Sequence, residues 1–141
     1  MHDTTEWSDE ELRALLGGVR TIAMVGASSK RDRPSHGVMK ILLRAGFHVI
    51  PVTPREDSVL GRRAYPSLMD ITERVDVVDV FRRPEDTPAI AKQAAAIGAR
   101  VLWLQDGIVN EEAAAIAREG GLAVVMNRCI GQTVHRLGIG A

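Results

Sequence analysis

TIAMVGASSKRDRPSHG, residues 21–37, is the stretch that decides the fold. Residues 21–25 form a short and continuous apolar run, which is typical of a strand buried on both faces of a sheet. Gly26 follows, then a polar loop over residues 27–34, and Ser35 is expected to cap a helix. The stretch therefore predicts a strand, a loop and a helix in immediate succession, which is the repeating unit of parallel sheets.

The same alternation of strand and helix continues along the chain. Further apolar runs predict strands over residues 47–52, 75–80, 100–104 and 122–126. Helices are expected over residues 8–16, 84–98, 110–119 and 131–137, with a short extended piece at 61–65 and a helical turn at 66–69. Ser8 and Glu11 form a capping box at the first of these helices. The predicted fold class is α/β: a Rossmann-like, doubly wound, mainly parallel five-stranded sheet with helices on both faces, in one domain over residues 1–141.

Charge, cysteine content and hydropathy narrow the class of protein. Lys+Arg and Asp+Glu are 18 each, so the formal net charge is +0, which disfavours binding along duplex nucleic acid. Cys129 is the only cysteine, which excludes an internal disulfide and disfavours a cysteine-rich zinc site. No apolar run approaches the ~20 residues of a membrane span, and residues 1–6 are too polar and acidic for a signal peptide. We therefore expect a cytoplasmic protein without a membrane segment.

The loop after the first strand has the features of a phosphate site. Gly26 permits a tight turn, the two serines offer hydroxyls, and the start of the next helix offers backbone N–H groups to an anion. A lysine and two arginines add positive charge, although a solvated basic turn would have the same composition. The loop has one glycine where a dinucleotide fingerprint has three, and it departs from the Walker A pattern. The predicted binding residues here are Gly26, Ala27, Ser28, Ser29, Lys30, Arg33, Ser35 and His36.

The loop after the second strand distinguishes between cofactors. An NAD site would place an acid at the end of this strand, where it binds the ribose hydroxyls. Here Thr53, Pro54 and Arg55 follow the strand. The arginine suits a phosphate on the ribose, which is the 2′-phosphate in NADP and the 3′-phosphate in coenzyme A. The alternative is an exposed arginine after a proline turn.

Two later loops are expected at the same edge of the sheet. Phe81 could lie against an adenine with Arg82 or Arg83 near the phosphates, although a phenylalanine at a strand end is more often a core residue. Gln105 could contact the far end of the ligand, where Gly107 permits close approach of the backbone. A solvated turn is the alternative for this loop.

Five short segments together resemble a known family. They are VGAS at 25–28, PVTPR at 51–55, DVFRRP at 79–84, WLQDGI at 103–108 and NRC at 127–129. In their order and spacing they resemble the small stand-alone CoA-binding proteins, which are related to the CoA-binding domain of the succinyl-CoA synthetase alpha subunit. The resemblance covers residues 21–129.

The resemblance implies a Rossmann-like domain that binds coenzyme A or an acyl-CoA. Residues 26–29 and the helix start at Ser35 would then face the pyrophosphate, and residues 53–55 the adenosine end. Phe81 would flank the adenine or the pantetheine, and residues 105–108 would approach the thiol. The synthetase keeps its phosphohistidine in a second domain, for which 141 residues leave no room, so the resemblance implies binding without the ligase reaction.

The residue pattern contains no recognisable catalytic or metal-binding constellation. His36 could donate to a phosphate, whereas His2, His48 and His135 lack the spacing of metal ligands. A minimal NADP-dependent oxidoreductase is one alternative function, but the single-glycine loop and the lack of a Tyr-x-x-x-Lys pair after Tyr65 argue against it. A nucleotide-sensing regulatory or interaction module is the other alternative. Whichever function holds, the chain could be a monomer or a homodimer.

Three further residues could bear on the site. Asp76 and Asp79 flank a buried strand, where capping or helix-end contacts are expected of them rather than acid–base chemistry. Cys129 follows the fifth strand. It is expected to be either a small buried hydrophobic residue or a neighbour of the ligand's thiol.

Overall fold

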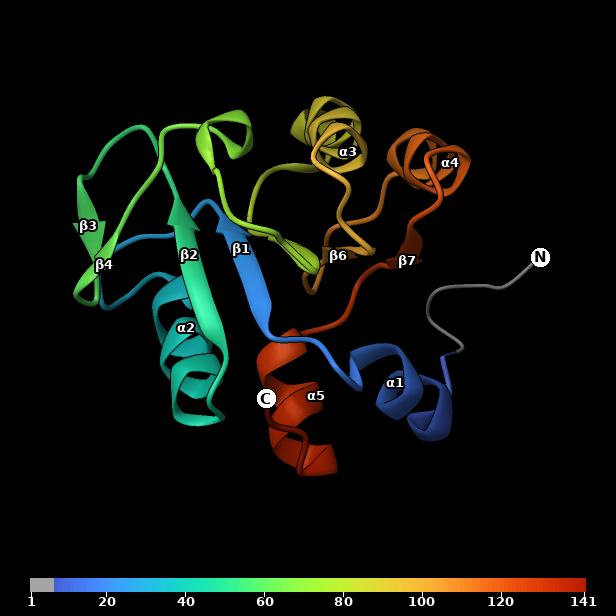
Figure 1. The fold of residues 1–141 in the computed structure, drawn as a ribbon, viewed down its shortest axis with the longest axis horizontal. Helices are drawn as coiled ribbons and strands as arrows, with labels where there is room; N and C mark the ends of the chain where they lie inside the picture. The colour runs from blue at the N-terminus through green and yellow to red at the C-terminus, as the bar shows by residue number, and fades with distance from the viewer. Residues whose placement is uncertain (1–6) are drawn as a thin grey trace.

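One parallel sheet forms the centre of the computed structural model, which describes residues 7–141 (Figure 1). Its strands are β1 (Thr21–Val25), β2 (His48–Val52), β5 (Val77–Val80), β6 (Val101–Leu104) and β7 (Ala123–Val125). They lie in the order β2-β1-β5-β6-β7, and every neighbouring pair is parallel. The predicted Rossmann-like α/β sheet is therefore confirmed. The N-terminal stretch 1–6, with His2, lies outside the described residues.

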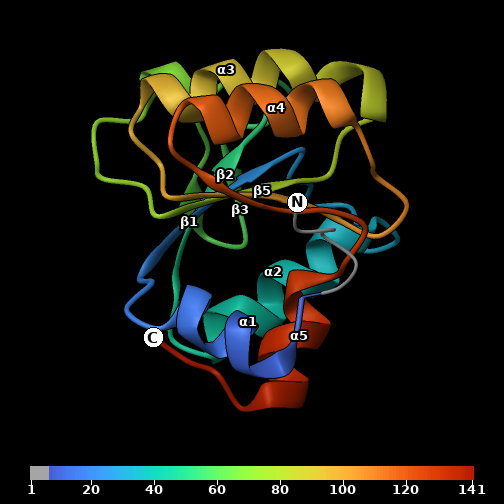
Figure 2. The ribbon, with the colours of Figure 1, turned by 90° about the vertical axis from the view of Figure 1, so that its right-hand side faces the viewer.

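Helices cover both faces of this sheet (Figure 2). On one face lie α1 (Asp9–Leu16), α2 (Pro34–Arg44) and α5 (Ile130–Leu137), and on the other lie α3 (Thr87–Ala96) and α4 (Glu111–Glu119). The chain winds outward from β1 to β2, then returns to β5 and winds the other way to β7. Because crossovers between parallel strands are right-handed, this reversal puts α2 on the face opposite α3. The topological switch point lies between β1 and β5.

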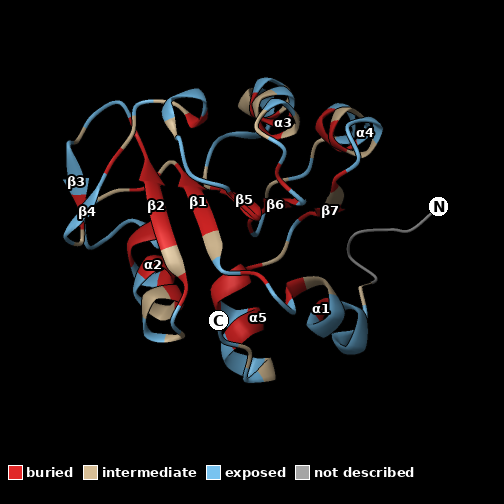
Figure 3. Ribbon diagram, in the orientation of Figure 1, coloured by how far each residue is buried: buried red, intermediate tan, exposed pale blue. Residues whose placement is uncertain are grey.

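The strands are buried on both faces, as their unbroken apolar sequences predict (Figure 3). In β1, Met24 belongs to the core beneath α1, α2 and α5, whereas Ala23 belongs to the core beneath α3 and α4. Side chains of a strand alternate in this way because its period is two residues. The α3–α4 contact depends on small residues, since a Cβ on Gly120 would lie only 2.7 Å from the Cβ of Ala95.

The helix starts test the predicted caps. Ser8 and Glu11 form the expected capping box on α1, and the side chain of Asn110 caps α4. At α2 the expectation was wrong: Arg33 is the N-cap, Pro34 is the first helical residue, and Ser35 lies buried inside the first turn. Proline suits this first position because its φ is already helical and its missing N–H needs no partner there. No helix within residues 7–141 is long and apolar enough to cross a membrane.

A small hairpin extends from the β2 edge of the sheet. It consists of β3 (Ser58–Val59) and β4 (Arg62–Arg63), joined by a turn at Leu60 and Gly61 that has positive φ at both residues. The sequence predicted only an extended piece at 61–65. Beyond the hairpin, Tyr65 bridges to Val52 at the end of β2, and the 3₁₀ turn η2 (Leu68–Asp70) forms where a helical turn was expected.

Candidate functional site

The parallel sheet brings all of the candidate loops to one edge. The loops follow the carboxyl ends of the strands, and β1 and β2 point toward the same edge (Figure 1). In a doubly wound sheet, a crevice opens at this edge beside the switch point, here between β1 and β5. The loops after β1, β2 and β5 therefore lie nearest to the predicted site, and those after β6 and β7 lie farther along the edge.

The loop after β5 lies so close to position 26 that only glycine fits there. The φ of Gly26 is +89°, and an added Cβ would lie 2.5 Å from the carbonyl oxygen of Phe81. Phe81 is also tied to β1, because its N–H donates to the carbonyl of Val25 at 2.8 Å. Only glycine permits this contact without displacing the loop after β5. Phe81 itself is half-buried and packs on the core beneath α2 and α5.

The phosphate loop, residues 26–33, already binds a carboxylate. The backbone N–H of Ser29 donates to Glu56 Oε2 at 3.0 Å, and the Ser29 hydroxyl donates to the other carboxylate oxygen. These hydrogen bonds, with a smaller contribution from the charge of Lys30, lower the pKa of Glu56 below its ordinary value. Sequence reasoning did not select Glu56, although an acid just after β2, the partner strand of β1, was a usable signal.

The start of α2 offers an anion fewer donors than a helix without proline. Pro34 has no N–H, and the N–H of His36 donates to the carbonyl of Arg33 at 3.0 Å. The His36 ring is buried, with Nδ1 3.3 Å from the carbonyl oxygen of Ser28. A hydrogen bond there requires the proton on Nδ1, so this imidazole supports the loop backbone.

The cations of the edge fall into two groups. Arg31, Arg33 and Arg55 are exposed, and no carboxylate in residues 7–141 lies within ion-pairing distance of them. Arg82 and Arg83 are instead engaged by acids of their own segment. Arg82 lies 3.1 Å from Asp86, and Arg83 lies 3.9 Å from Glu85 and 3.8 Å from Asp86. Thr53 accepts the N–H of Arg55 at 3.2 Å, which shapes the turn after β2 through Pro54.

The loops after β6 and β7 bond to each other. The buried Gln105 accepts the N–H of Ile130 at 3.1 Å and so caps the start of α5. The N–H of Gly107 donates to the side chain of Asn127 at 2.7 Å. These contacts hold the two loops together. They also use the Gln105 oxygen and the Gly107 N–H, in the loop that was predicted to contact the far end of the ligand.

Cys129 is a core residue. It is 9% exposed, packs in the cluster beneath α2 and α5, and precedes the first residue of α5. Its carbonyl accepts both the N–H and the hydroxyl of Thr133. The position at the carboxyl edge agrees with the prediction, and the burial agrees with a small hydrophobic residue.

Asp76 and Asp79 turn out to differ. Asp76 accepts the N–H groups of Arg20 at 2.9 Å and Thr21 at 3.1 Å, which is the capping contact expected of it. Asp79 lies in β5 between Met24 and Trp103, is fully buried, and has no hydrogen-bond partner on either oxygen among residues 7–141. Removal from water raises the pKa of Asp79 well above its ordinary value, so the expectation of capping contacts was wrong for this residue.

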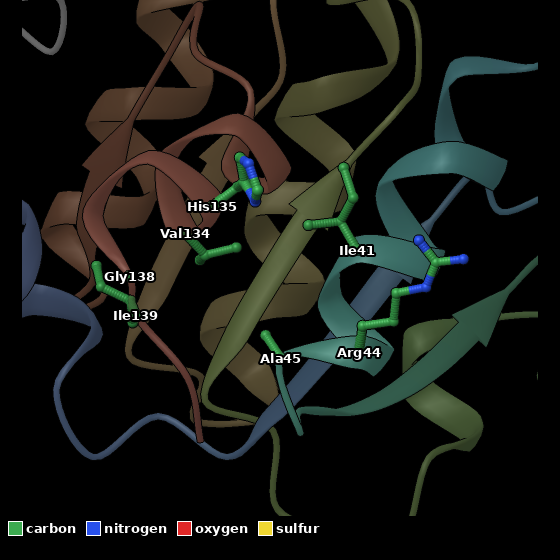
Figure 4. A pocket seen from close by; sticks show the side chains of 7 residues that line it. All are labelled: Ile41, Arg44, Ala45, Val134, His135, Gly138 and Ile139. Carbon is green, nitrogen blue, oxygen red and sulfur yellow. The ribbon is translucent and has the colours of Figure 1, made fainter.

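The two other described histidines, His48 and His135, lie away from the carboxyl edge of the sheet. His48 Nε2 lies 2.9 Å from Glu73, in an exposed pair at the start of β2. Within residues 7–141, no three His, Cys, Asp or Glu side chains are placed to hold a metal ion together. His135 lies far from the loops, beside a cavity of about 450 Å³ between the distal halves of α2 and α5 (Figure 4). The cavity has Arg44 and otherwise mainly apolar side chains around it, and none of the predicted binding residues lines it.

Comparison with known proteins agrees with this architecture. Residues 20–134 match the family model described as "CoA binding domain". The chain is 42% identical to the uncharacterised protein YneT of Bacillus subtilis (strain 168), over 87% of this chain and 91% of that protein. The structure of a hypothetical protein from Pyrococcus horikoshii OT3 superposes with a TM-score of 0.91 at 42% identity, covering 97% of this chain and 96% of that one.

A more distant similarity reaches larger enzymes. The chain is 28% identical to the ADP-forming acetate–CoA ligase II of Archaeoglobus fulgidus, over 66% of this chain. That match spans only 14% of the ligase, so the chain corresponds to a small part of the enzyme.

Proposed function

Because the chain belongs to the CoA binding domain family, we propose that it binds coenzyme A or an acyl-CoA at the carboxyl edge, without catalysing a reaction itself. The observation that carries this proposal is the pair of donors on Ser29. Its N–H and its hydroxyl hold a carboxylate in the loop where the fold family binds phosphates. A loop that holds one anion with two donors is suited to hold a pyrophosphate.

In this arrangement the pyrophosphate lies against residues 28–30. The exposed side chain of Arg55 binds the 3′-phosphate of the ribose, because no carboxylate in residues 7–141 lies within ion-pairing distance of its guanidinium. Phe81, half-buried at the switch point, flanks the adenine or the pantetheine. The pantetheine then runs along the edge toward the loops after β6 and β7.

The ligase reaction is not part of this proposal. The similarity to the Archaeoglobus ligase covers 14% of that enzyme and includes no more than the segment that matches this chain.

Calorimetric titration with CoA, dephospho-CoA and NADP tests the proposal. We expect CoA to bind more tightly than dephospho-CoA, and we expect Arg55→Ala to weaken CoA binding about tenfold while leaving dephospho-CoA unchanged. Equal affinity for CoA and dephospho-CoA in the native chain would remove the role of Arg55. Binding of NADP but not of CoA would favour the alternative hypothesis of an NADP-dependent oxidoreductase.

Mass spectrometry of the natively purified protein would identify a retained ligand and the acyl group that it carries. We expect a retained ligand with the mass of CoA or of a single acyl-CoA. If the protein carries an NADP mass instead, the proposed ligand is wrong.

A further inference from the structure

The anion already bound by the phosphate loop is part of the chain. We infer that Glu56 occupies the position of a ligand phosphate in the free protein, so that CoA must displace this carboxylate and Glu56 limits the affinity of the site. The inference rests on the proposed function. It adds an affinity-determining residue that the candidate phosphate loop does not itself contain.

The geometry resembles that of a bound phosphate. Two oxygens of Glu56 accept from two donors of Ser29, one from the backbone and one from the side chain. A phosphate group would use the same two donors, because carboxylate and phosphate oxygens are both charged acceptors. The two anions therefore cannot occupy Ser29 at the same time.

The local charge favours exchange for a ligand with more charge. Lys30 and the Ser29 hydrogen bonds lower the pKa of Glu56, so its carboxylate is ionised at neutral pH. One carboxylate does not neutralise the positive charge around the loop, since Arg31, Arg33 and Arg55 are exposed and lack an ion-pair partner within residues 7–141. A ligand with several phosphate charges gains from these cations, whereas Glu56 brings a single charge.

Displacement is also inexpensive. The contacts between Glu56 and Ser29 are exposed to solvent, and exposed pairs of this kind change a binding constant by about fivefold or less. The residue also lies after the end of β2, beyond the residues that pair with β1, so its side chain can turn away without breaking the sheet. A structural role is the competing explanation: Glu56 would hold the loop in the shape that binds the ligand, and its loss would weaken binding.

The test compares Glu56→Gln with Asp57→Asn. Both variants remove one negative charge, at the half-buried Glu56 and at the adjacent, exposed Asp57. Only Glu56 contacts Ser29, and the side chain of Asp57 makes no hydrogen bond or ion pair within residues 7–141. Calorimetric titrations measure the affinity of both variants for CoA and for inorganic pyrophosphate. We expect Glu56→Gln to bind each ligand about fivefold more tightly than Asp57→Asn does, and Glu56→Ala to behave like Glu56→Gln.

The outcomes separate this inference from the proposed function. If CoA binds the native chain and both variants equally, or binds Glu56→Gln more weakly, Glu56 does not compete and the inference is overturned while the proposed function stands. If pyrophosphate binds Glu56→Gln more tightly than Asp57→Asn but CoA binds no variant, the competition between Glu56 and a phosphate stands, whereas the proposed function and the displacement by CoA are overturned. If neither ligand binds any variant, both are overturned.

Discussion

The two halves of the carboxyl edge use their polar groups differently. On the switch-point side, which comprises residues 26–33 and 53–56, Arg31, Arg33 and Arg55 are exposed without an ion-pair partner in residues 7–141, and the exposed Ser29 binds the carboxylate of Glu56. On the β6–β7 side, which comprises residues 105–110 and 126–130, the side chains of Gln105, Asn110 and Asn127 accept hydrogen bonds from backbone N–H groups of the fold. Topology makes every loop at this edge a candidate, but a ligand can use only groups that are free or that an exposed contact, such as the one between Ser29 and Glu56, can release.

The reversal of winding explains this difference. The chain leaves β1 and β5 in opposite directions, and in doubly wound sheets ligands bind where the loops diverge in this way. From β5 to β7 the winding keeps one direction, and consecutive loops lie beside each other. Neighbouring loops can then satisfy one another, as Asn127 does for the N–H of Gly107.

Asp79 lies beneath the boundary between the two sides, and its replacement should have the largest effect. Its pKa is raised by burial, so the folded chain keeps a proton that the unfolded chain releases above about pH 4. The unfolded state then binds fewer protons, and the free energy of unfolding of the native chain falls as the pH rises, until the pKa of the folded state is reached. Asp79→Asn lacks this loss.

We therefore expect the stability of Asp79→Asn relative to the native chain to increase by about 1.4 kcal/mol per pH unit above pH 4, up to the pKa of the folded state. Urea unfolding at pH 5, 6 and 7 measures the difference. Asp57→Asn, at an exposed site, serves as the control and should follow the native profile. Parallel profiles for Asp79→Asn and the native chain would mean that Asp79 has a partner.

Gly26→Ala should have the next largest effect, because it tests whether the start of the phosphate loop is structural. The substitution places a Cβ 2.5 Å from the carbonyl oxygen of Phe81 at a φ of +89°. We expect a loss of about 2–4 kcal/mol in the free energy of unfolding. Gly37→Ala is the matched control: nothing lies within 4 Å of its Cβ inside α2, so it should stabilise by about 0.5–1 kcal/mol. Equal effects would contradict the close approach.

Sequence patterns predicted the sheet well and the contacts between loops poorly. Apolar runs such as residues 21–25 are local signals, and the Ser8–Glu11 capping box spans three positions, so both could be read directly. The hairpin at 58–63 has strands of two residues, which are too short for a period to appear. The start of α2 was misplaced by two residues, because Ser35 is a good cap but Pro34 is a better first helical residue.

The loops that make up the candidate site were predicted from the sequence. The hydrogen-bond partners and the burial of the individual residues in these loops were not. Ser29 and Glu56 are 27 positions apart, and Gln105 and Ile130 are 25 apart. Such pairs meet only because the sheet order makes their strands neighbours, and a single sequence does not state that order. That Asp79 lacks a hydrogen-bond partner among residues 7–141 is likewise a property of the packed interior, which no sequence motif records.

Gln105→Ala tests the β6–β7 side directly. Removing its oxygen leaves the N–H of Ile130 without its acceptor at a buried position, which should cost about 1–3 kcal/mol in the free energy of unfolding. We expect the affinity for CoA to change less than about twofold, since that side chain is already used by the fold. Asp106→Ala, on the exposed neighbour, should change neither quantity. A tenfold loss of CoA affinity with unchanged stability would assign Gln105 to the ligand and remove the contrast between the two sides.

Lys30→Ala should have the smallest effect on stability and should act only on the ligand. Lys30 is exposed in the phosphate loop, so its truncation should change the free energy of unfolding by less than about 0.5 kcal/mol. CoA affinity should fall about threefold at low salt, and the difference should shrink at ~0.5 M salt, because exposed charges are screened. Calorimetry at two ionic strengths measures this, with Lys92→Ala on the exposed side of α3 as the control for loss of a positive charge. A loss that is equal for both lysines would reflect net charge alone, whereas a loss confined to Lys30 would locate the ligand's phosphates on the switch-point side.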